Sequence, residues 1–379
     1  MGIKRVALFG PYWGRSDGWS RVVEKLTYTL AQYVNEVLLF LAEDSPRRKV
    51  VKDNIYVRYL LPKITESYNL SYLLLQPWKK RLNLIKEFLT SEADLVQVYD
   101  VWPYSLDASI VTSLTKIPLF IGAHGTAALK PLIRGLTRSL LKNSCCRANG
   151  VLCISRYTLN ILRKTLRLRN LILQPLDGVD YEHFSKPRDI KALRERWNGR
   201  ILLSVCAIQE RKGLDISMMA FKYVKKKFKD VKYIVIGRGD CSKYVELMRE
   251  QNITDVYFLS KVSDEELAKY YQLCDIYILT PKRVGWNVEG FGLTYLEANA
   301  AGKPVIGSIS GGVPDVIRHG ETGLLVPERD VKATARALTT LLEEENYARE
   351  LGTRGKYWAK HFDWRNISQQ VIEVWEKCL

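Results

Sequence analysis

Short apolar runs alternate with amphipathic segments along the whole chain. Each run is four to six residues long and rich in Val, Ile and Leu, as is typical of strands buried in a parallel sheet. The segment after the first run shows helical spacing at Val22, Val23, Leu26 and Leu30. The predicted strands are Val6–Phe9, Val37–Phe40, Leu95–Asp100, Pro118–Gly122, Val151–Ser155, Ile201–Val205, Tyr233–Gly237, Val256–Leu259, Ile276–Leu279 and Pro304–Gly307.

The strand–helix alternation occurs twice, which predicts two doubly wound α/β domains. A length of 379 residues fits this number of domains. A polar break at Phe184–Arg188 places the predicted join, so we expect an N-terminal domain at 1–185 and a C-terminal domain at 186–360. Ligands of such folds bind beyond the carboxyl ends of the strands, and we expect the site in a cleft between the domains.

Composition indicates a soluble globular protein without a disulfide framework. Hydrophobic residues make up 47% and charged residues 26% of the chain, which argues against disorder. The seven cysteines form no C-x-x-C pair, as expected of reduced thiols in the cytoplasm. No apolar stretch reaches the roughly 18 residues of a membrane span, so the sequence predicts peripheral membrane contact at most.

Positive charge is concentrated in the first half. The chain has 58 basic and 41 acidic residues, a net charge of +17, and residues 1–185 hold 26 and 15 of these, a net charge of +11. Residues 108–176 contain eleven basic residues and no acidic one. Such a field favours anionic partners: nucleic acid, an anionic membrane or phosphorylated substrates.

Four of these cations recur at every fourth position and predict a basic stripe on one helix. Apolar residues fall mainly on the opposite side, so the segment reads equally as a membrane-surface helix or as an ordinary helix packed on the core. Tyr72–Arg81, with a Trp beside three cations, is a second candidate membrane contact. The stripe is Lys130, Arg134, Arg138 and Lys142, and its apolar partners are Leu132, Ile133, Leu136 and Leu140.

Two carboxylates flank a glycine-rich turn in the second half. Glu289 and Glu297 are separated by seven residues, and Gly290-Phe291-Gly292 between them opens a predicted helix at Leu293. Glycines let backbone N–H groups approach a ligand closely, and a helix N-terminus favours anions. This pattern predicts a cradle for a diphosphate.

The run Glu289–Ile306 resembles the E-x7-E motif of family 4 glycosyltransferases, which are retaining nucleotide-sugar transferases with the GT-B fold. Further segments resemble that family in the right order and cover most of the chain. The resemblance implies that the C-terminal domain binds the nucleotide sugar, that the N-terminal domain binds the acceptor, and that a helix at 361–379 crosses back to the N-terminal domain. The further segments are Gly18–Leu26, Gly122–Gly125, Asp177–Phe184, Gly311–Ile317 and Gly320–Val326.

The resemblance also assigns roles to individual residues. It implies that Glu289 contacts the sugar hydroxyls, that Glu297 contacts the ribose, and that His124, after a buried strand, lies near the transferred sugar. Donor contacts are expected at Gly18, Lys212, Gly290, Phe291, Gly292 and Leu293.

The family's usual arginine five or six residues before Lys212 is missing, because Cys206 and Ala207 occupy those positions. Arg211 and Arg238 are the alternative replacements. Asp177 stands where the family commonly has asparagine.

By resemblance, we expect transfer of a hexose with retention of configuration, the departing diphosphate taking the acceptor's proton. No D-x-D motif occurs, so neither a metal nor another cofactor is expected. The charge favours an acceptor glycan or phosphate-bearing lipid and a cytoplasmic protein that associates with an anionic membrane, and nucleic-acid signatures are missing. A sugar-nucleotide epimerase of the same fold and a non-enzymatic basic module for membranes or nucleic acid are the alternatives.

Overall fold

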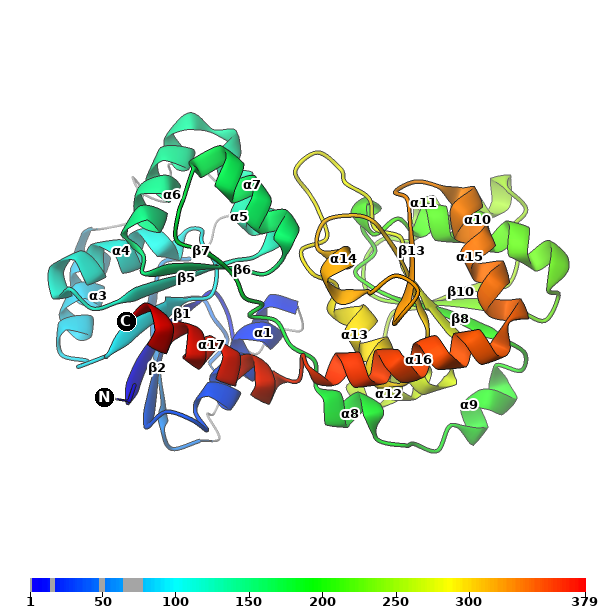
Figure 1. Cartoon of the computed structure of the whole chain (residues 1–379), viewed down its shortest axis with the longest axis horizontal. Helices are drawn as coiled ribbons and strands as arrows, with labels where there is room; N and C mark the ends of the chain where they lie inside the picture. Colours follow the sequence, from blue (N-terminus) through cyan, green and yellow to red (C-terminus); the bar gives the residue numbers. More distant parts are fainter. Residues whose placement is uncertain (1, 14–17, 48–51, 64–77) are drawn as a thin grey trace. The chain divides into compact units, whose positions relative to one another are not determined.

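The computed structural model describes residues 2–13, 18–47, 52–63 and 78–379, which fall into two compact units (Figure 1). The first unit comprises Met1–Gly178 and Trp364–Leu379, and the second comprises Val179–Asp363. Each is built on its own parallel sheet, so the two doubly wound domains predicted from the alternation are confirmed.

The N-terminal unit has seven parallel strands in the order β3-β2-β1-β4-β5-β6-β7. The central strands are fully buried because helices cover both faces, α4, α6 and α7 on one and α1 and α17 on the other (Figure 1). The strands are β1 (Arg5–Gly10), β2 (Glu36–Ala42), β3 (Ile55–Leu61), β4 (Leu95–Val98), β5 (Leu119–Ala123), β6 (Gly150–Cys153) and β7 (Leu171–Leu173). The helices are α1 (Gly18–Leu30), α3 (Trp78–Leu89), α4 (Tyr104–Thr115), α5 (Gly125–Leu129), the 3-10 turn η1 (Lys130–Ile133), α6 (Gly135–Arg147), α7 (Arg156–Leu166) and α17 (Trp364–Cys378).

The C-terminal unit has six parallel strands in the order β10-β9-β8-β11-β12-β13. The strands are β8 (Ile201–Val205), β9 (Lys232–Ile236), β10 (Val256–Leu259), β11 (Ile276–Ile278), β12 (Val305–Ser308) and β13 (Gly323–Val326). The helices are α8 (Tyr181–Ser185), α9 (Lys191–Arg196), the 3-10 turn η2 (Glu210–Lys212), α10 (Leu214–Lys227), α11 (Ser242–Glu250), α12 (Asp264–Leu273), α13 (Leu293–Ala300), α14 (Val313–Val316), α15 (Val331–Glu343) and α16 (Glu345–Lys360).

In both sheets the strand order reverses beside the first strand, between β1 and β4 and between β8 and β11. This switch point is where doubly wound folds bind ligands. The ten predicted strands are all present, with ends shifted by up to two residues. The apolar pattern missed β3, β7 and β13, which lie at sheet edges and, in β3 and β7, leave several side chains partly exposed.

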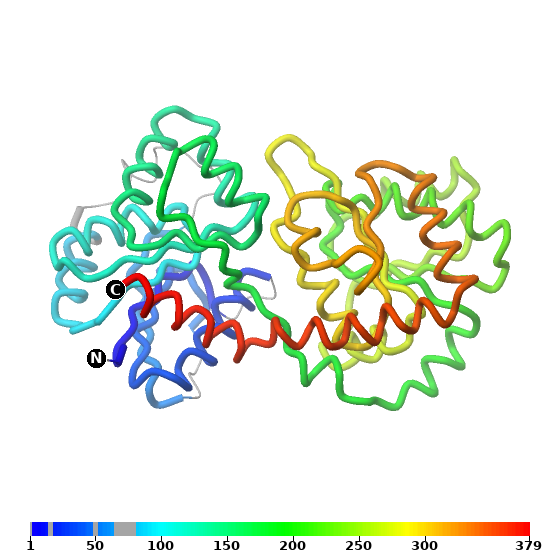
Figure 2. The backbone as a smooth tube through the Cα atoms, in the orientation of Figure 1, coloured from blue at the N-terminus to red at the C-terminus, as the bar shows by residue number. Residues whose placement is uncertain are grey.

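The last helix of the chain packs in the N-terminal unit. Figure 2 shows this segment lying beside α1, and α17 contacts α1 directly. Trp375 is completely buried, and its indole Nε1 donates a hydrogen bond to Gln97 Oε1 at 3.0 Å. The Thr29 and Ser368 hydroxyls are 2.6 Å apart. The chain therefore completes its first core with its last residues.

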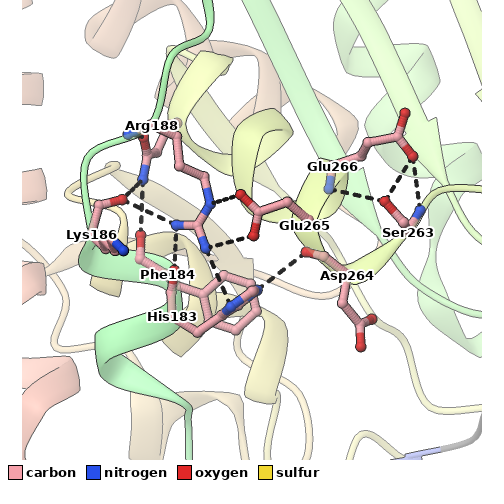
Figure 3. Close-up of polar contacts among 9 residues, drawn as sticks. His183, Phe184, Lys186, Arg188, Ser263, Asp264, Glu265 and Glu266 are labelled. Carbon is pink, nitrogen blue, oxygen red and sulfur yellow. Dashed lines mark hydrogen bonds and ion pairs between the residues drawn. The ribbon is translucent and has the colours of Figure 1, made fainter.

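The units divide after Gly178, earlier than the boundary expected after residue 185. The reason is visible in Figure 3: the segment after Gly178 is fastened to α12 of the C-terminal unit. Arg188 donates from Nε and Nη2 to the Glu265 carboxylate at 2.8 and 3.1 Å, and His183 Nε2 lies 3.2 Å from the carbonyl oxygen of Asp264. Helix α8 therefore belongs to the second core, and the polar break at 184–188 is a surface contact of that core.

The single basic helix expected through residues 130–142 is broken. Residues 130–133 form the 3-10 turn η1, Arg134 is extended at φ −102° and ψ 133°, and α6 starts only at Gly135. Pro131 has no N–H to donate and lies at the start of η1, where a proline is tolerated, and Lys130 before it keeps helical dihedrals; the extended residue is Arg134.

The expected separation of leucines from cations is also wrong in part. Leu132 is buried, but Ile133 and Leu136 are 56% and 53% exposed. They lie in the same exposed stretch as Arg134 and Arg138, whereas the buried face of α6 is made by other side chains. The second candidate membrane contact, Tyr72–Arg81, lies for the most part outside the described residues.

Candidate active site

The carboxylate of Glu289 receives two cations in the C-terminal unit. Its Oε2 accepts a hydrogen bond from Lys212 Nζ at 2.6 Å and from Arg211 Nη1 at 2.9 Å. Burial raises the pKa of Glu289, but the positive charges of Lys212 and Arg211 outweigh burial and hold this pKa below its ordinary value. The cluster is therefore ionised and carries one more positive than negative charge.

The turn η2 places both cations on the same carboxylate. Gly213 ends this turn at φ +67°, and a Cβ there would lie 1.7 Å from the Thr280 carbonyl oxygen, so only glycine fits. The Lys282 N–H donates to the carbonyl of Arg211 at 2.8 Å, and the buried Lys282 ammonium pairs with Asp215 at 2.6 Å. The loop after β8 is thereby fastened to the loop after β11, on the two sides of the switch point.

Glycines fix Glu289 just before helix α13. Gly292 precedes the helix at φ +107°, where side chains are strained, and a Cβ there would meet the Tyr295 ring at 2.7 Å. The Glu289 carbonyl accepts a hydrogen bond from the Gly312 N–H at 2.9 Å. Phe291 is buried and Leu293 begins the helix. Helix α13 thus begins four residues beyond Glu289, and in its first turn the Tyr295 N–H donates to the Gly292 carbonyl at 3.1 Å, while a helix N-terminus of this kind suits the predicted diphosphate cradle.

Glu297 is buried on α13 and is held by a tyrosine. Tyr271 donates its hydroxyl to Glu297 Oε2 at 2.6 Å. Burial and the charge of Glu297 raise the pKa of Tyr271 well above its ordinary value, so this hydroxyl stays a donor. The hydrogen bond fixes the orientation of the carboxylate, and the ribose contact expected of Glu297 stays a prediction.

Of the two candidate replacements for the missing arginine, Arg211 lies at the Glu289 cluster. The side chain of Arg238 is exposed and makes no hydrogen bond or ion pair within the part of the chain that the structure describes. Cys206, at the position of the missing arginine, is buried, and burial raises the pKa of its thiol to about 11. A neutral thiol therefore stands there, and Arg211 supplies the second cation.

In the N-terminal unit, His124 lies between two carboxylates. It follows β5, is buried, and its Nε2 is 3.1 Å from Asp177 Oδ1. Burial lowers the pKa of His124, but the charge and hydrogen bond of Asp177 and the charge of Asp100 outweigh burial and raise this pKa to about 9. The imidazole is therefore protonated at neutral pH.

Asp100 is the residue that the sequence analysis missed. It follows β4, its Oδ1 accepts a hydrogen bond from the Val101 N–H at 2.8 Å, and burial raises its pKa to about 7, against the opposing charge of His124. Gly122 lets the two strand ends approach, because a Cβ there would lie 2.3 Å from the Tyr99 carbonyl oxygen. The signal for Asp100 is a carboxylate at the end of a buried apolar run, but the apolar pattern extends the predicted strand through Asp100, whereas β4 ends at Val98.

The remaining predicted residues are Gly18 and the four cations of the basic stripe. Gly18 begins α1, and residues 14–17 before it are outside the described ranges. The side chains of Arg134, Arg138 and Lys142 are exposed, and that of Lys130 is half-buried.

The described residues hold neither a candidate metal site nor a membrane-spanning helix. No group of three or more His, Cys, Asp or Glu side chains there could hold a metal ion. No helix in the described ranges combines the length and apolar content needed to cross a membrane.

Two family models match consecutive parts of the chain. The model of glycosyl transferases group 1 matches residues 185–358, and the model of Glycosyltransferase Family 4 matches residues 16–173. The chain belongs to the family 4 type of glycosyltransferases. The predicted family is thereby confirmed, and so is the prediction that the protein is a glycosyltransferase.

Several glycosyltransferases are similar to this chain, over all or part of its length. An uncharacterised glycosyltransferase of Methanocaldococcus jannaschii is 26% identical over 100% of this chain and 98% of its own length. A GDP-mannose-dependent alpha-(1-6)-phosphatidylinositol monomannoside mannosyltransferase of Mycolicibacterium smegmatis is 27% identical over 63% of this chain and 65% of its own length. HepE of Anabaena, solved with UDP and glucose, aligns over 99% of both chains with a TM-score of 0.76 and 20% identity, which supports the GT-B fold.

Proposed function

We propose that this glycosyltransferase moves a hexose from a nucleotide-diphosphate sugar to an acceptor with retention of anomeric configuration. The observation that carries the proposal is the convergence of Lys212 and Arg211 on Glu289 directly before α13. A diphosphate would take over the two cations, and Glu289 would then be available to the sugar hydroxyls. Charge-assisted hydrogen bonds of this kind stabilise the negative charge that develops on a leaving diphosphate.

Retention is proposed from the family resemblance. In this reading the bond from the sugar C1 to the diphosphate breaks, the acceptor oxygen bonds C1 on the same face, and the acceptor's proton passes to the departing diphosphate. The protein positions both substrates and stabilises charge. Binding of the diphosphate by Lys212 and Arg211 is consistent with activity without a metal, and turnover that survives EDTA would support this.

The test is incubation of the purified protein with GDP-mannose and UDP-glucose, chosen after a thermal-shift screen of donors. Slow release of nucleoside diphosphate supports transfer, with water as the acceptor. NMR of the product anomer formed on an added acceptor then decides retention. Interconversion of the sugar would favour the epimerase alternative, and absence of donor binding would favour a non-enzymatic module.

We propose further that the acceptor is a glycan or a phosphate-bearing lipid and that the protein binds the cytoplasmic face of an anionic membrane peripherally. The support is the exposed surface of Ile133, Arg134, Leu136, Arg138 and Lys142, which joins apolar and basic side chains. Each basic residue near such a membrane contributes about 1 kcal/mol. The mycobacterial relative named above acts on a phosphatidylinositol mannoside by its description.

The test is co-sedimentation with phosphatidylserine-containing and neutral liposomes across a salt series. Binding that requires the anionic lipid and weakens with salt supports the proposal. Charge reversal at Arg134 and Arg138 should abolish it. The matched control reverses Lys226 and Lys229, exposed lysines of the C-terminal unit, with the same change in net charge. If both variants lose liposome binding equally, net charge alone explains the binding. If the wild type does not bind anionic liposomes at low salt, the membrane proposal is contradicted.

A further inference from the structure

A buried lysine lies at the switch point of the C-terminal sheet, next to the Glu289 cluster. Lys282 follows β11, its side chain is only 5% exposed, and its ammonium nitrogen lies 2.6 Å from Asp215 Oδ2. Asp215 Oδ1 has no hydrogen-bond partner among the described residues, so Lys282 alone holds this carboxylate there. A buried ammonium is costly unless it is paired, so the position of Lys282 depends on Asp215 in turn.

Lys282 holds the segment that carries both cations of the cluster at two points. Its backbone N–H donates to the carbonyl oxygen of Arg211 at 2.8 Å, and its side chain reaches Asp215 in the first turn of α10. Lys212 lies between these two points in the chain. The turn η2 and the start of α10 are therefore fastened to one residue of the neighbouring loop.

The loop that begins at Lys282 also closes around Arg211. At the far end of this loop, the Glu289 carboxylate accepts a hydrogen bond from Arg211 Nη1 at 2.9 Å. Between the two ends, the backbones of Val284 and Asn287 exchange hydrogen bonds of 3.1 and 3.0 Å, which close the loop into a hairpin. Arg211 is thus held through its backbone by the first residue of the loop and through its side chain by the last.

Two plainer explanations account for less of this arrangement. Asp215 suits the positive N-terminus of α10, which explains the carboxylate but not the buried lysine. Thr280 also joins the two loops, because its hydroxyl donates to the Gly213 carbonyl oxygen at 2.9 Å. That hydrogen bond does not involve Arg211, but it keeps the loops joined when the ion pair is removed, so variants of the ion pair should fold.

We infer that the ion pair between Lys282 and Asp215 positions Arg211 and Lys212 for the donor diphosphate. The inference rests on the proposed function, which assigns the diphosphate to these two cations. Because Asp215 neutralises the charge of Lys282, the pair gives an anion little attraction of its own, so Lys282 is a positioning residue and not a third phosphate ligand. The pair keeps η2 in place when the two cations exchange the Glu289 carboxylate for the diphosphate.

Calorimetric titration of three variants with UDP and GDP separates positioning from charge. Lys282→Met removes a positive charge, Asp215→Asn removes a negative charge, and the double variant removes both. Positioning predicts weaker binding in all three, by about tenfold in Lys282→Met and equally in the double variant, because either substitution breaks the same link. An effect of charge predicts tighter binding in Asp215→Asn and nearly wild-type binding in the double variant.

The matched control is the ion pair between Lys225 and Asp255, which involves the last turn of α10 in the same unit. Its nitrogen and oxygen are 2.8 Å apart, and the carboxylate is 32% exposed, against 30% for Asp215. Lys225→Met and Asp255→Asn make the same changes of charge and should leave the affinity for UDP and GDP unchanged. Uridine and guanosine, which carry no phosphate, should bind equally to all variants by ligand-observed NMR, whereas a general loosening of the site would weaken their binding too.

Hydrogen exchange tests the position of η2 without a ligand. The N–H groups of Lys212 and Gly213 donate to carbonyl oxygens three residues earlier, at 3.0 and 3.1 Å. Mass spectrometry of a peptide across residues 209–215 should show faster exchange in Lys282→Met than in the wild type and in Lys225→Met.

The inference is overturned if Lys282→Met binds UDP and GDP like the wild type, if Asp215→Asn binds them more tightly, or if exchange across 209–215 is unchanged. Lys282→Arg keeps the charge and the ion pair and should recover most of the lost affinity. All affinities are compared at a temperature at which every variant is folded. Failure of the proposed function looks different: the wild type would then bind neither UDP nor GDP and release no nucleoside diphosphate from nucleotide sugars, and the exchange experiment alone would decide the inference.

Discussion

The two halves of this molecule share a strand order but arrange charge in opposite ways at the switch point. In the C-terminal half, Lys212 and Arg211 surround the carboxylate of Glu289. In the N-terminal half, Asp100 and Asp177 surround the imidazole of His124. Similar parallel sheets thus carry one site with two cations around a carboxylate and one site with two carboxyl groups around a histidine. The fold determines where the site lies, at the carboxyl ends of the strands, and the side chains in the loops after the strands determine which ligand can bind there.

The halves also differ in how their cores are completed. The C-terminal half is built from one continuous segment, Val179–Asp363, whereas the N-terminal half needs Trp364–Leu379 from the end of the chain. The two halves thus differ in the charges at their sites and in whether one continuous segment builds the core, and substitutions test each difference.

The largest effect is expected from Trp375→Ala. This side chain is fully buried in the N-terminal core, so its truncation should cost about 3–5 kcal/mol of unfolding free energy. Deletion of residues 365–379 should destabilise the protein further. Thermal denaturation measures both, with the highly exposed Tyr357→Ala as a control near zero. Wild-type melting of the Trp375 variant would mean that α17 does not complete the N-terminal core.

Glu289→Ala should lower the rate of nucleoside-diphosphate release by about 10²–10³-fold, the range seen when a group that contacts the reacting centre is lost. The melting temperature should also fall, because the Lys212 side chain is only 12% exposed and loses its carboxylate partner, so the rates are compared at a temperature at which both proteins are folded. Glu289→Gln keeps the shape and should show how much of the loss is due to charge. Turnover at the parent rate in both variants would remove Glu289 from the active site.

Opposite charge predicts opposite pH dependence of the two halves. The pKa of His124 is raised to about 9, so its contribution to stability is fully present below its ordinary value of 6.5 and is lost as pH rises through 9. Burial raises the pKa of Asp100 from its ordinary 3.8 to about 7. The stability of the fold therefore also falls as pH rises through this range. Glu289, with a lowered pKa, instead contributes stability above its ordinary 4.5, which is lost as pH falls through its folded-state value.

The free energy of unfolding of the N-terminal half should therefore fall by an amount on the order of 1–3 kcal/mol between pH 6 and pH 10. Its melting temperature should fall accordingly. Asp177→Asn should reduce this shift, and Asp53→Asn should leave it unchanged. Calorimetry across this pH range measures it. A pH dependence that is identical in wild type and Asp177→Asn would contradict a charged His124.

The smallest effect is expected from Arg211→Ala, which should weaken nucleoside-diphosphate binding by about tenfold, or roughly 1.4 kcal/mol. Lys212→Ala should weaken it at least as much. Arg238→Ala is the matched control, because Arg238 is exposed and lies outside the ion-paired cluster. Calorimetric titration with UDP and GDP measures all three. A greater loss in Arg238→Ala would show that this residue replaces the missing arginine.

Local pattern was sufficient for much of the fold. Buried central strands are continuous apolar runs, and these runs predict nine central strands and the edge strand β10, all of which exist. Edge strands carry a weaker signal because one side of the strand has no neighbour and the helices cover it less completely. This is why β3 and β7 escaped prediction. The break at Arg134 gives no such signal: the four-residue repeat of cations predicts one helix, and Pro131 lies at the start of the 3-10 turn, not at the break.

The sequence by itself determined the two doubly wound domains, the glycine-rich turn after Glu289 and, through its resemblance to a family, the kind of reaction. Only the tertiary structure decided that Arg211 and Lys212 meet on one carboxylate oxygen and that Asp100 lies beside His124. Strands and turns follow from interactions between near neighbours in the chain. Side-chain convergence instead depends on which strand ends become adjacent in the sheet, and Asp177 reaches His124 across 53 residues only because the folded sheet brings their loops together.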